Sequence, residues 1–529
     1  MTRVLYRNAR VLTADEPGWA EAVVVEDARF AYVGSAADAP PADETVDLAG
    51  RVVLPGFTDA HTHLLMMGDA LGQVGLTDAR SLDEIQARLR AARPAADGVL
   101  RGRGWLFDSI PGGAPTAAMI DAAVADIPVY LDANDYHSCW VNTAALAELG
   151  ITRDTPDPIG GRIERDADGE ATGMLYETAA VQYAWAHRDA TTTDAQRDAA
   201  VDRVVAAYLA SGVVGAVDMA FDEHGLSALG RASARGAQPL RIAAHWFVAN
   251  TGDDAGNLAQ VAHAVELARV EHAGVRVVGI KLVLDGTIDA CTAAMCHPYA
   301  DGANAAPIWP AEHLLPVVAA ADAAGLQIAL HAIGDAASTL ALDAIEHAAA
   351  VNGDRPRRHR IEHLEYAAPG TAERMARLGV TASMQPVHAD PAIFANWAAQ
   401  LGDERVDRAF AWPEFEDAGA LLAFSTDAPT APHEALANMY VAATRASALD
   451  PASAAVHPHL ALPLERAIAH ATRDAAASTG DGAWRGRIAA GHAADFAVLD
   501  VDPFAEGPDA LLRARVVRTV IGGRTVYEG

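Results

Sequence analysis

Lysine is almost absent from this 529-residue sequence, because Lys281 is the only lysine among forty basic residues and the others are arginines. Arginine therefore stands wherever only positive charge matters, which indicates that Lys281 does something a guanidinium cannot. A lysine amine that loses its proton can add to carbon dioxide and form a carbamate, whereas arginine stays protonated. The alternative is a chance lysine on a solvated surface. The apolar, β-branched run 277–284 around it instead predicts a buried strand.

Cysteines and long apolar runs are also scarce. Cys139, Cys291 and Cys296 are too few for a disulfide framework, and the last two lack the spacing of a zinc-binding pair, so we interpret them as buried thiols. No run of about 18 apolar residues is present, and the first ten residues lack the apolar core of a signal peptide. We therefore expect a cytoplasmic protein.

The charge of the chain excludes two classes of partner. A net charge of -30 without a basic patch repels nucleic acid and anionic membrane surfaces. Apolar residues make up 51% of the sequence, enough for one large domain and an accessory one. We expect a small molecule as the partner, and a homodimer is the default for the oligomeric state.

The two ends of the chain show the same pattern of short strands joined by turns. Strands are expected at 4–12, 22–25, 30–33, 495–499, 516–521 and 525–527, the last two joined by a Gly-Gly turn. A few strands cannot bury a face alone. Residues 1–52 and 476–529 are therefore predicted to pair into one small β-sandwich.

Between the ends, a helix, a glycine and a short apolar run recur. Gly212, Gly325, Gly379 and Gly419 occupy the position that ends a helix in the left-handed conformation. The eight candidate strands are 52–57, 213–219, 241–248, 277–284, 326–330, 358–362, 380–384 and 420–424. This alternation predicts an α/β fold with a (β/α)8 TIM barrel over residues 53–475. An open, doubly wound sheet is the alternative.

Residues 94–190 do not follow this repeat. The segment contains turn-rich stretches that carry aromatic side chains, including 102–108 and 132–137. We interpret it as an insertion packed over the mouth of the barrel, where it would supply substrate-selecting groups.

Polar residues with metal-binding chemistry stand where the predicted barrel strands end. They are His61, His63, His331, His363 and Asp427, and Lys281 ends a strand in the same way. Any one of them alone could be a hydrogen-bonded core group. The carboxyl ends of the strands meet at one face of a barrel, so together these residues predict a metal site there.

The ordered set of motifs resembles the amidohydrolase superfamily, and within it the YtcJ-like branch that includes N-substituted formamide deformylase. The resemblance spans almost the whole chain and rests on residues 55–63, Lys281 with 285–287 and 298–299, and then 331–335, 359–363, 385–386, 426–429 and 491–496. It implies a TIM barrel, a β-sandwich from both termini and one or two divalent metal ions, usually zinc. One departure is Ser425-Thr426 before Asp427, where glycine and serine are more usual.

The resemblance also implies roles for single residues. In two-metal members one ion would be held by His61, His63 and Asp427 and the other by His331 and His363, with carboxylated Lys281 bridging; with one ion, Lys281 would be neutral. The metal would activate water and polarise a carbonyl. Asp427 would carry the proton of the water to the departing amine. A Gly-x-Ser-x-Gly elbow and a lysine-containing phosphate loop are absent.

Four residues are candidates for substrate contacts. His137 lies in a stretch that resembles a family segment near the pocket, and Trp105, Tyr136 and His388 are further candidates. The alternatives are a hydrogen-bonded loop histidine for His137, and a packed aromatic or surface histidine for the others. The expected activity is hydrolysis of a non-peptide carbon–nitrogen bond in an amide or N-substituted formamide. The alternatives are lyase, isomerase or decarboxylase chemistry at the same site, and a catalytically inactive binding protein.

Overall fold

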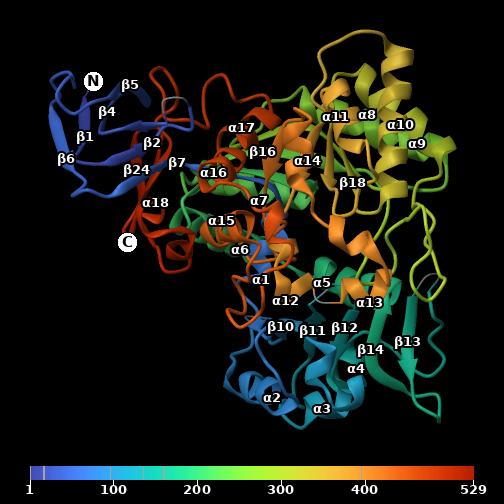
Figure 1. Cartoon of the computed structure of the whole chain (residues 1–529). Coiled ribbons are helices and arrows are strands. Elements are labelled where there is room, and N and C mark those ends of the chain that lie inside the picture. Colours follow the sequence, from blue (N-terminus) through green and yellow to red (C-terminus); the bar gives the residue numbers. More distant parts are fainter. Residues whose placement is uncertain are drawn as a thin grey trace. The chain divides into compact units, whose positions relative to one another are not determined.

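The computed structural model describes residues 2–15, 18–95, 97–134, 136, 138–158, 161–394 and 396–529. The chain forms two compact units, one made of Met1–Leu64 with Val204–Gly529 and the other of Leu65–Arg203 (Figure 1). Among the described helices, none combines the length and apolar composition needed to cross a membrane.

An eight-stranded parallel sheet forms the centre of the first unit. In sheet order its strands are β21 (Leu422–Phe424), β20 (Thr381–Met384), β19 (Arg360–His363), β18 (Gln327–Ala332), β17 (Val275–Val283), β16 (Arg241–Phe247), β15 (Val213–Phe221) and β8 (Phe57–Thr62). The two end strands meet beyond β21, where the amide of Asp427 donates to the carbonyl of His61 at 2.8 Å. The sheet is therefore a nearly closed barrel, as predicted, and not an open doubly wound sheet.

Helices alternate with these strands along the chain. They include α6 (Asp194–Ala210), α7 (Glu223–Ala234), α8 (Asp254–Ala268), α9 (Ala311–Ala323), α10 (Asp335–Asn352), α11 (Thr371–Leu378), α14 (Trp412–Asp417), α15 (Ala435–Thr444), α16 (Leu464–Ala471) and α17 (Arg473–Ser478). The four glycines predicted to end helices, Gly212, Gly325, Gly379 and Gly419, all have φ between 64° and 81°. A side chain is disfavoured in that conformation, which explains glycine at each position.

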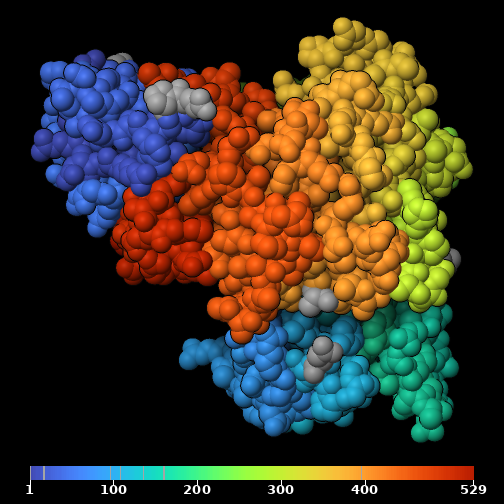
Figure 2. All heavy atoms as spheres, in the orientation of Figure 1, coloured from blue at the N-terminus to red at the C-terminus, as the bar shows by residue number. Residues whose placement is uncertain are grey.

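Two sheets built from the chain ends form the predicted sandwich. One has the order β5-β4-β1-β6, from Arg29–Gly34, Ala22–Glu26, Val4–Arg7 and Glu44–Asp47. The other has the order β24-β23-β22-β7-β2-β3, from Arg524–Glu528, Val516–Ile521, Phe496–Leu499, Val52–Pro55, Arg10–Leu12 and Trp19–Ala20. Tyr6 of one sheet packs edge-on against Phe496 of the other, with ring centroids 5.1 Å apart. The N-terminal and C-terminal segments therefore lie side by side, with β7 paired to β22 (Figure 2).

Two of the predicted strands, one at the start of the chain and one in the predicted barrel, are divided in the structure. The run 4–12 breaks at Asn8, whose φ of 55° separates β1 in one sheet from β2 in the other. The run 52–57 becomes β7 in the sandwich and β8 in the barrel, separated by Gly56. A Cβ atom at Gly56 would lie 2.4 Å from a methyl group of Val214, so the two sheets are joined at a position where only glycine fits.

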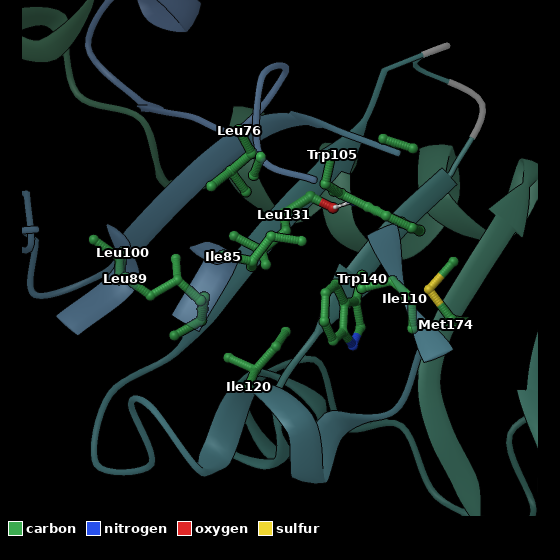
Figure 3. Close-up of a cluster of buried hydrophobic side chains, with 13 residues drawn as sticks. Leu76, Ile85, Leu89, Leu100, Trp105, Ile110, Ile120, Leu131, Trp140 and Met174 are labelled. Carbon is green, nitrogen blue, oxygen red and sulfur yellow. Dashed lines mark hydrogen bonds between the residues drawn. The ribbon is translucent and has the colours of Figure 1, made fainter. Parts of the chain in front are cut away.

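The second unit is built on a sheet of its own. Its six strands have the order β13 (Gly161–Arg165), β14 (Ala171–Glu177), β12 (Ser138–Val141), β11 (Val129–Ala133), β10 (Leu100–Trp105) and β9 (Val74–Gly75). Its helices include α2 (Leu82–Ala91), α3 (Ala117–Asp121), α4 (Thr143–Glu148) and α5 (Ala186–Thr191). Trp105 and Trp140, with ring centroids 5.4 Å apart, lie in the core beside Leu131 and Ile120 (Figure 3). The segment predicted to be rich in turns is thus largely an ordered sheet.

Candidate metal centre

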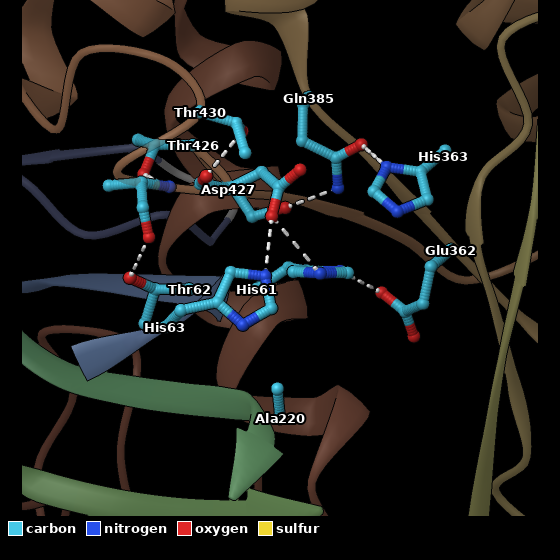
Figure 4. A network of polar contacts seen from close by, with 12 residues as sticks. His61, Thr62, His63, Ala220, Glu362, His363, Gln385, Thr426, Asp427 and Thr430 are labelled. Atoms are coloured by element: carbon cyan, nitrogen blue, oxygen red, sulfur yellow. Dashed lines mark hydrogen bonds and ion pairs between the residues drawn. The ribbon is translucent and has the colours of Figure 1, made fainter. Parts of the chain in front are cut away.

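The structure brings the six predicted site residues together at the carboxyl ends of five barrel strands. His61 and His63 come from the end of β8, Lys281 from β17, His331 from β18 and His363 from β19, while Asp427 follows β21. Nε2 of His63 lies 3.0 Å and Nε2 of His61 lies 3.3 Å from Oδ1 of Asp427 (Figure 4). The ring centroid of His363 is 4.8 Å from that of His61 and 4.3 Å from that of His331.

Lys281 lies inside this cluster and not on a solvated surface. Its side chain projects from β17, the residue is 2% exposed, and its Nζ is 3.3 Å from Nε2 of His61. Burial lowers the pKa of Lys281 to about 8, although Glu362 and Asp427 oppose the shift. The only lysine of the chain is therefore a buried amine that loses its proton more readily than an exposed one.

Two of the histidines are held by hydrogen bonds through Nδ1. Nδ1 of His61 lies 2.8 Å from a carboxylate oxygen of Glu362, and Nδ1 of His363 lies 2.8 Å from Oε1 of Gln385. Gln385 donates its amide to the hydroxyl of Ser425 at 2.8 Å, which assigns its oxygen to His363. Because a neutral imidazole has one N–H, donation from Nδ1 leaves the lone pair of each histidine on Nε2.

Glu362 is itself held by a buried arginine. Both guanidinium contacts from Arg360 to its carboxylate are short, at 2.6 and 3.0 Å, and neither residue is exposed. Burial alone would raise the pKa of Glu362, but Arg360 and His61 hold it well below its usual range. Glu362 therefore stays ionised and accepts the Nδ1 hydrogen of His61.

Asp59 fixes the loop that carries Asp427. Its carboxylate accepts hydrogen bonds from the Thr426 hydroxyl at 2.5 Å, the Thr426 amide at 3.0 Å and the Tyr208 hydroxyl at 2.9 Å. Burial raises the pKa of Asp59 to about 6, although these bonds oppose the shift. Thr426, which departs from the usual family residue, thus has a defined partner. Asp427 follows it with a φ of 59°, a conformation uncommon for a residue with a side chain.

Asp285 likewise fixes the loop after β18 by accepting hydrogen bonds from its backbone. It accepts hydrogen bonds from the amides of Ile333, Gly334 and Ala294 at 2.9 to 3.0 Å. Its Oδ1 also lies 3.5 Å from Nε2 of His331. Burial raises the pKa of Asp285 to about 7 despite the three amides. The position of His331 therefore depends on a carboxyl group buried at the end of the neighbouring strand.

Three histidines of the cluster, His61, His331 and His363, are neutral in this environment. Burial is the main cause that lowers the pKa of His61 to about 4 and that of His331 to about 3, and it holds the pKa of His363 well below its usual range. Burial would raise the pKa of Asp427, but the surrounding histidines keep it low. Neutral imidazoles and an ionised carboxylate are the forms that bind a divalent ion.

Sequence reasoning missed most residues that support the cluster. Asp59 lies two residues before His61 on β8, so strand alternation could have placed it on the same side. Asp218 of β15 is buried and accepts the amide of Leu64 at 2.8 Å next to His63. No local pattern marks that contact, because it joins residues 154 positions apart.

The four residues predicted to contact substrate lie in different surroundings. Trp105 is fully buried in the core of the second unit and donates its Nε1 hydrogen to the carbonyl of Leu131. The hydroxyl of Tyr136 is buried without a hydrogen-bond partner within the described residues, and His137 lies outside the described residues. His388 lies within the cluster, where its ring stacks parallel to His363 with centroids 6.0 Å apart.

Known proteins are similar to this chain over nearly its whole length. A family model described as "Amidohydrolase family" matches residues 44–527. A Bacillus subtilis (strain 168) protein named "Putative amidohydrolase YtcJ" is 31% identical over 525 residues, covering 96% of each chain. The N-substituted formamide deformylase of Arthrobacter pascens is 28% identical over 553 residues, covering 100% of this chain and 99% of its own. The structure of an uncharacterized metal-dependent hydrolase from Pyrococcus horikoshii OT3 covers 99% of this chain and 100% of its own, with a TM-score of 0.78 and 24% identity.

Proposed function

Because the chain belongs to the amidohydrolase family, as its motifs indicated, we propose that it hydrolyses a non-peptide carbon–nitrogen bond in a metal-dependent reaction. The proposed substrate class is an amide or an N-substituted formamide. The observation that carries the proposal is the convergence of His61, His63 and Asp427, whose ligand atoms all lie within 4.8 Å of one another. The similarity to N-substituted formamide deformylase supports the formamide alternative.

The residues of the cluster fit a metal ion. The lone pairs of His61 and His363 are directed to Nε2 by their Nδ1 contacts. Nδ1 of His63 is buried without a hydrogen-bond partner among the described residues, and burying an unpaired nitrogen is unfavourable unless something binds it. Imidazole and carboxylate donors suit zinc, so we propose one or two zinc ions held by His61, His63, His331, His363, Asp427 and Lys281.

A bound divalent ion would polarise the substrate carbonyl and lower the pKa of a water molecule. Asp427 is the candidate proton carrier, because its carboxylate is ionised and lies among the histidines. It would accept a proton from the attacking water and donate it to the departing nitrogen. Asp59 and Thr426 would hold its backbone in place during that transfer. Carboxylated Lys281 would supply two more oxygen ligands if two ions are present.

Three further expectations remain predictions. They are the division into residues 1–52, 53–475 and 476–529 with a substrate-selecting insertion at 94–190, a cytoplasmic location, and a homodimer. His137, Trp105, Tyr136 and His388 are kept as proposed substrate contacts.

The proposal is tested by metal analysis of the purified protein together with a panel of formamides, acyl amides, cyclic amides and carbamates. Hydrolysis in ¹⁸O-labelled water must place the label in a carboxylate product. We expect Asp427→Asn to lower kcat by at least about 10²-fold, because it removes an acid–base group. A conversion of substrate that leaves the label out of the product would instead indicate lyase, isomerase or decarboxylase chemistry. Purified protein that holds no divalent ion and converts no compound would favour a binding protein.

A further inference from the structure

His388 lies beside Asp427 and faces a different carboxylate oxygen from the one that His61 and His63 face. It belongs to a short 3-10 segment, Pro386–Ala389, that follows β20. Its Nε2 is 3.7 Å from Oδ2 of Asp427, whereas His61 and His63 face Oδ1. The carboxylate of Asp427 therefore presents one oxygen to His61 and His63 and the other to His388.

The anchoring of His388 repeats that of the two other histidines held through Nδ1. Its Nδ1 lies 3.0 Å from a carboxylate oxygen of Glu365, a residue that is 6% exposed. Glu365 stands three residues after Glu362, which anchors His61 in the same way. A carboxylate that holds one imidazole nitrogen while the other faces outward is the usual support of a metal-binding histidine. Such support sets the ring direction and the tautomer.

The distance between His388 and Asp427 fits two ligands of one ion better than a hydrogen bond. A nitrogen and an oxygen 3.7 Å apart are beyond hydrogen-bond range. Two ligand atoms at about 2.0 to 2.2 Å from a tetrahedral zinc ion lie roughly 3.3 to 3.6 Å apart. His363, His388 and Asp427 each offer a ligand atom, and the three atoms all lie within 4.8 Å of one another.

His331 is arranged differently. Its Nε2 is directed toward the carbonyl of Gly286 and Oδ1 of Asp285, both at 3.5 Å. Among the described residues it belongs to neither group of three converging ligand atoms. The ligands that the family resemblance implies for a second ion, His331 and His363, are thus supplemented by a residue expected only to touch substrate.

We propose that His388 is a metal ligand, which joins His363 and Asp427 among the ligands of a second divalent ion next to the one held by His61, His63 and Asp427. The inference rests on the proposed metal-dependent function. Asp427 would then contribute to both groups of ligands, and Glu365 is the positioning residue that presents Nε2 of His388.

The test compares metal binding of four proteins after chelation and titration with zinc. We expect two ions per wild-type chain. His388→Ala should lose one ion or bind it at least about 100-fold more weakly, and Glu365→Gln should weaken it by about 10- to 100-fold. The matched control is His470→Gln, because His470 is also buried and also bonds a carboxylate through Nδ1 at 2.8 Å, yet belongs to neither group. It should bind zinc as the wild type does.

Two results would overturn the inference. One is a His388→Ala protein that binds the same number of ions with affinities within about threefold of the wild type. The other is a crystal structure of the zinc-loaded wild type in which anomalous density lies near His363 but not within about 2.0 to 2.2 Å of Nε2 of His388. The crystal structure also decides the question if His388→Ala does not fold.

The same measurements separate this inference from the proposed hydrolysis. If His388→Ala loses an ion while the wild type hydrolyses no compound of the panel, the ligand stands and the proposed reaction falls. If the wild type hydrolyses an amide and His388→Ala keeps every ion, the reaction stands and the ligand falls.

Discussion

The proposed carbamate on Lys281 can be tested with unusual selectivity, because Lys281 is the only lysine of the chain. Carbamate formation needs the free amine, and burial lowers the pKa of Lys281 from 10.5 to about 8. At pH 7 the free amine is then about 10% of the total instead of roughly 0.03%, a gain of about 300-fold. Raising the pH from 6 to 8 increases that fraction from about 1% to about half.

The assay adds ¹³C-labelled bicarbonate and zinc to metal-free protein and records the carbamate carbon by NMR. Lys281 and the α-amino group are the only amines that can react. Lys281→Arg is therefore a matched control that keeps the charge and leaves only the α-amino group. We expect one carbamate signal in the wild type that the variant lacks, formed faster as the pH rises. We also expect weaker zinc uptake in buffer free of carbon dioxide.

Either of two results would refute this reasoning. In the first, zinc-loaded wild type shows no signal beyond that of the variant. In the second, Lys281→Arg folds, binds the same number of ions and turns over substrate at the wild-type rate.

Two further predictions concern buried carboxylates. Glu362→Gln leaves the guanidinium of Arg360 buried without its charge partner, so we expect the protein to lose about 3 to 5 kcal/mol of stability. The same change removes the carboxylate that anchors His61, so we expect zinc to bind about 10- to 100-fold more weakly. Thermal melting and zinc titration check both effects, and unchanged values for both would contradict the role of Glu362. Burial alone would raise the pKa of Asp322, but hydrogen bonds to its carboxylate, the strongest from Arg357, outweigh burial and lower the pKa to about 2. The ionised form therefore stabilises the fold above pH 4 by about 2 kcal/mol, and this contribution is lost as the pH falls through 2. Asp322→Asn should thus melt lower than the wild type at pH 7, with the difference shrinking toward pH 2; a difference independent of pH would show that charge is not the cause.

The barrel could be predicted because its strands are continuous apolar runs that end in polar residues. Seven of the eight predicted runs coincide with strands of one sheet. The eighth, 52–57, is apolar throughout, so the pattern could not show that it crosses from one sheet to another at Gly56. In the second unit, β10 alternates arginine and glycine between Leu100 and Trp105, and this sequence resembles a turn more than a strand.

The candidate site was predicted through its ligand atoms and not through the groups that hold them. Histidines and an aspartate at strand ends are visible along the chain, as is a solitary lysine. The contact from Glu362 to His61 spans 301 positions, and a single sequence has no sign of it. His388 looked like a peripheral histidine because the turn after β20 that directs it inward depends on packing.

The continuity of β7 and β8 has a consequence for the order in which the protein is assembled. His61 and His63 stand at the end of β8, which follows β7 of the sandwich sheet directly. One of the two neighbours of β7 in that sheet is β22, residues Phe496–Leu499, paired from Val52 to Pro55. That neighbour is synthesised more than 400 residues later. The strand that leads into two of the candidate ligands therefore gains this lateral support only after β22 has been synthesised, and a nascent chain must keep an apolar edge covered until then.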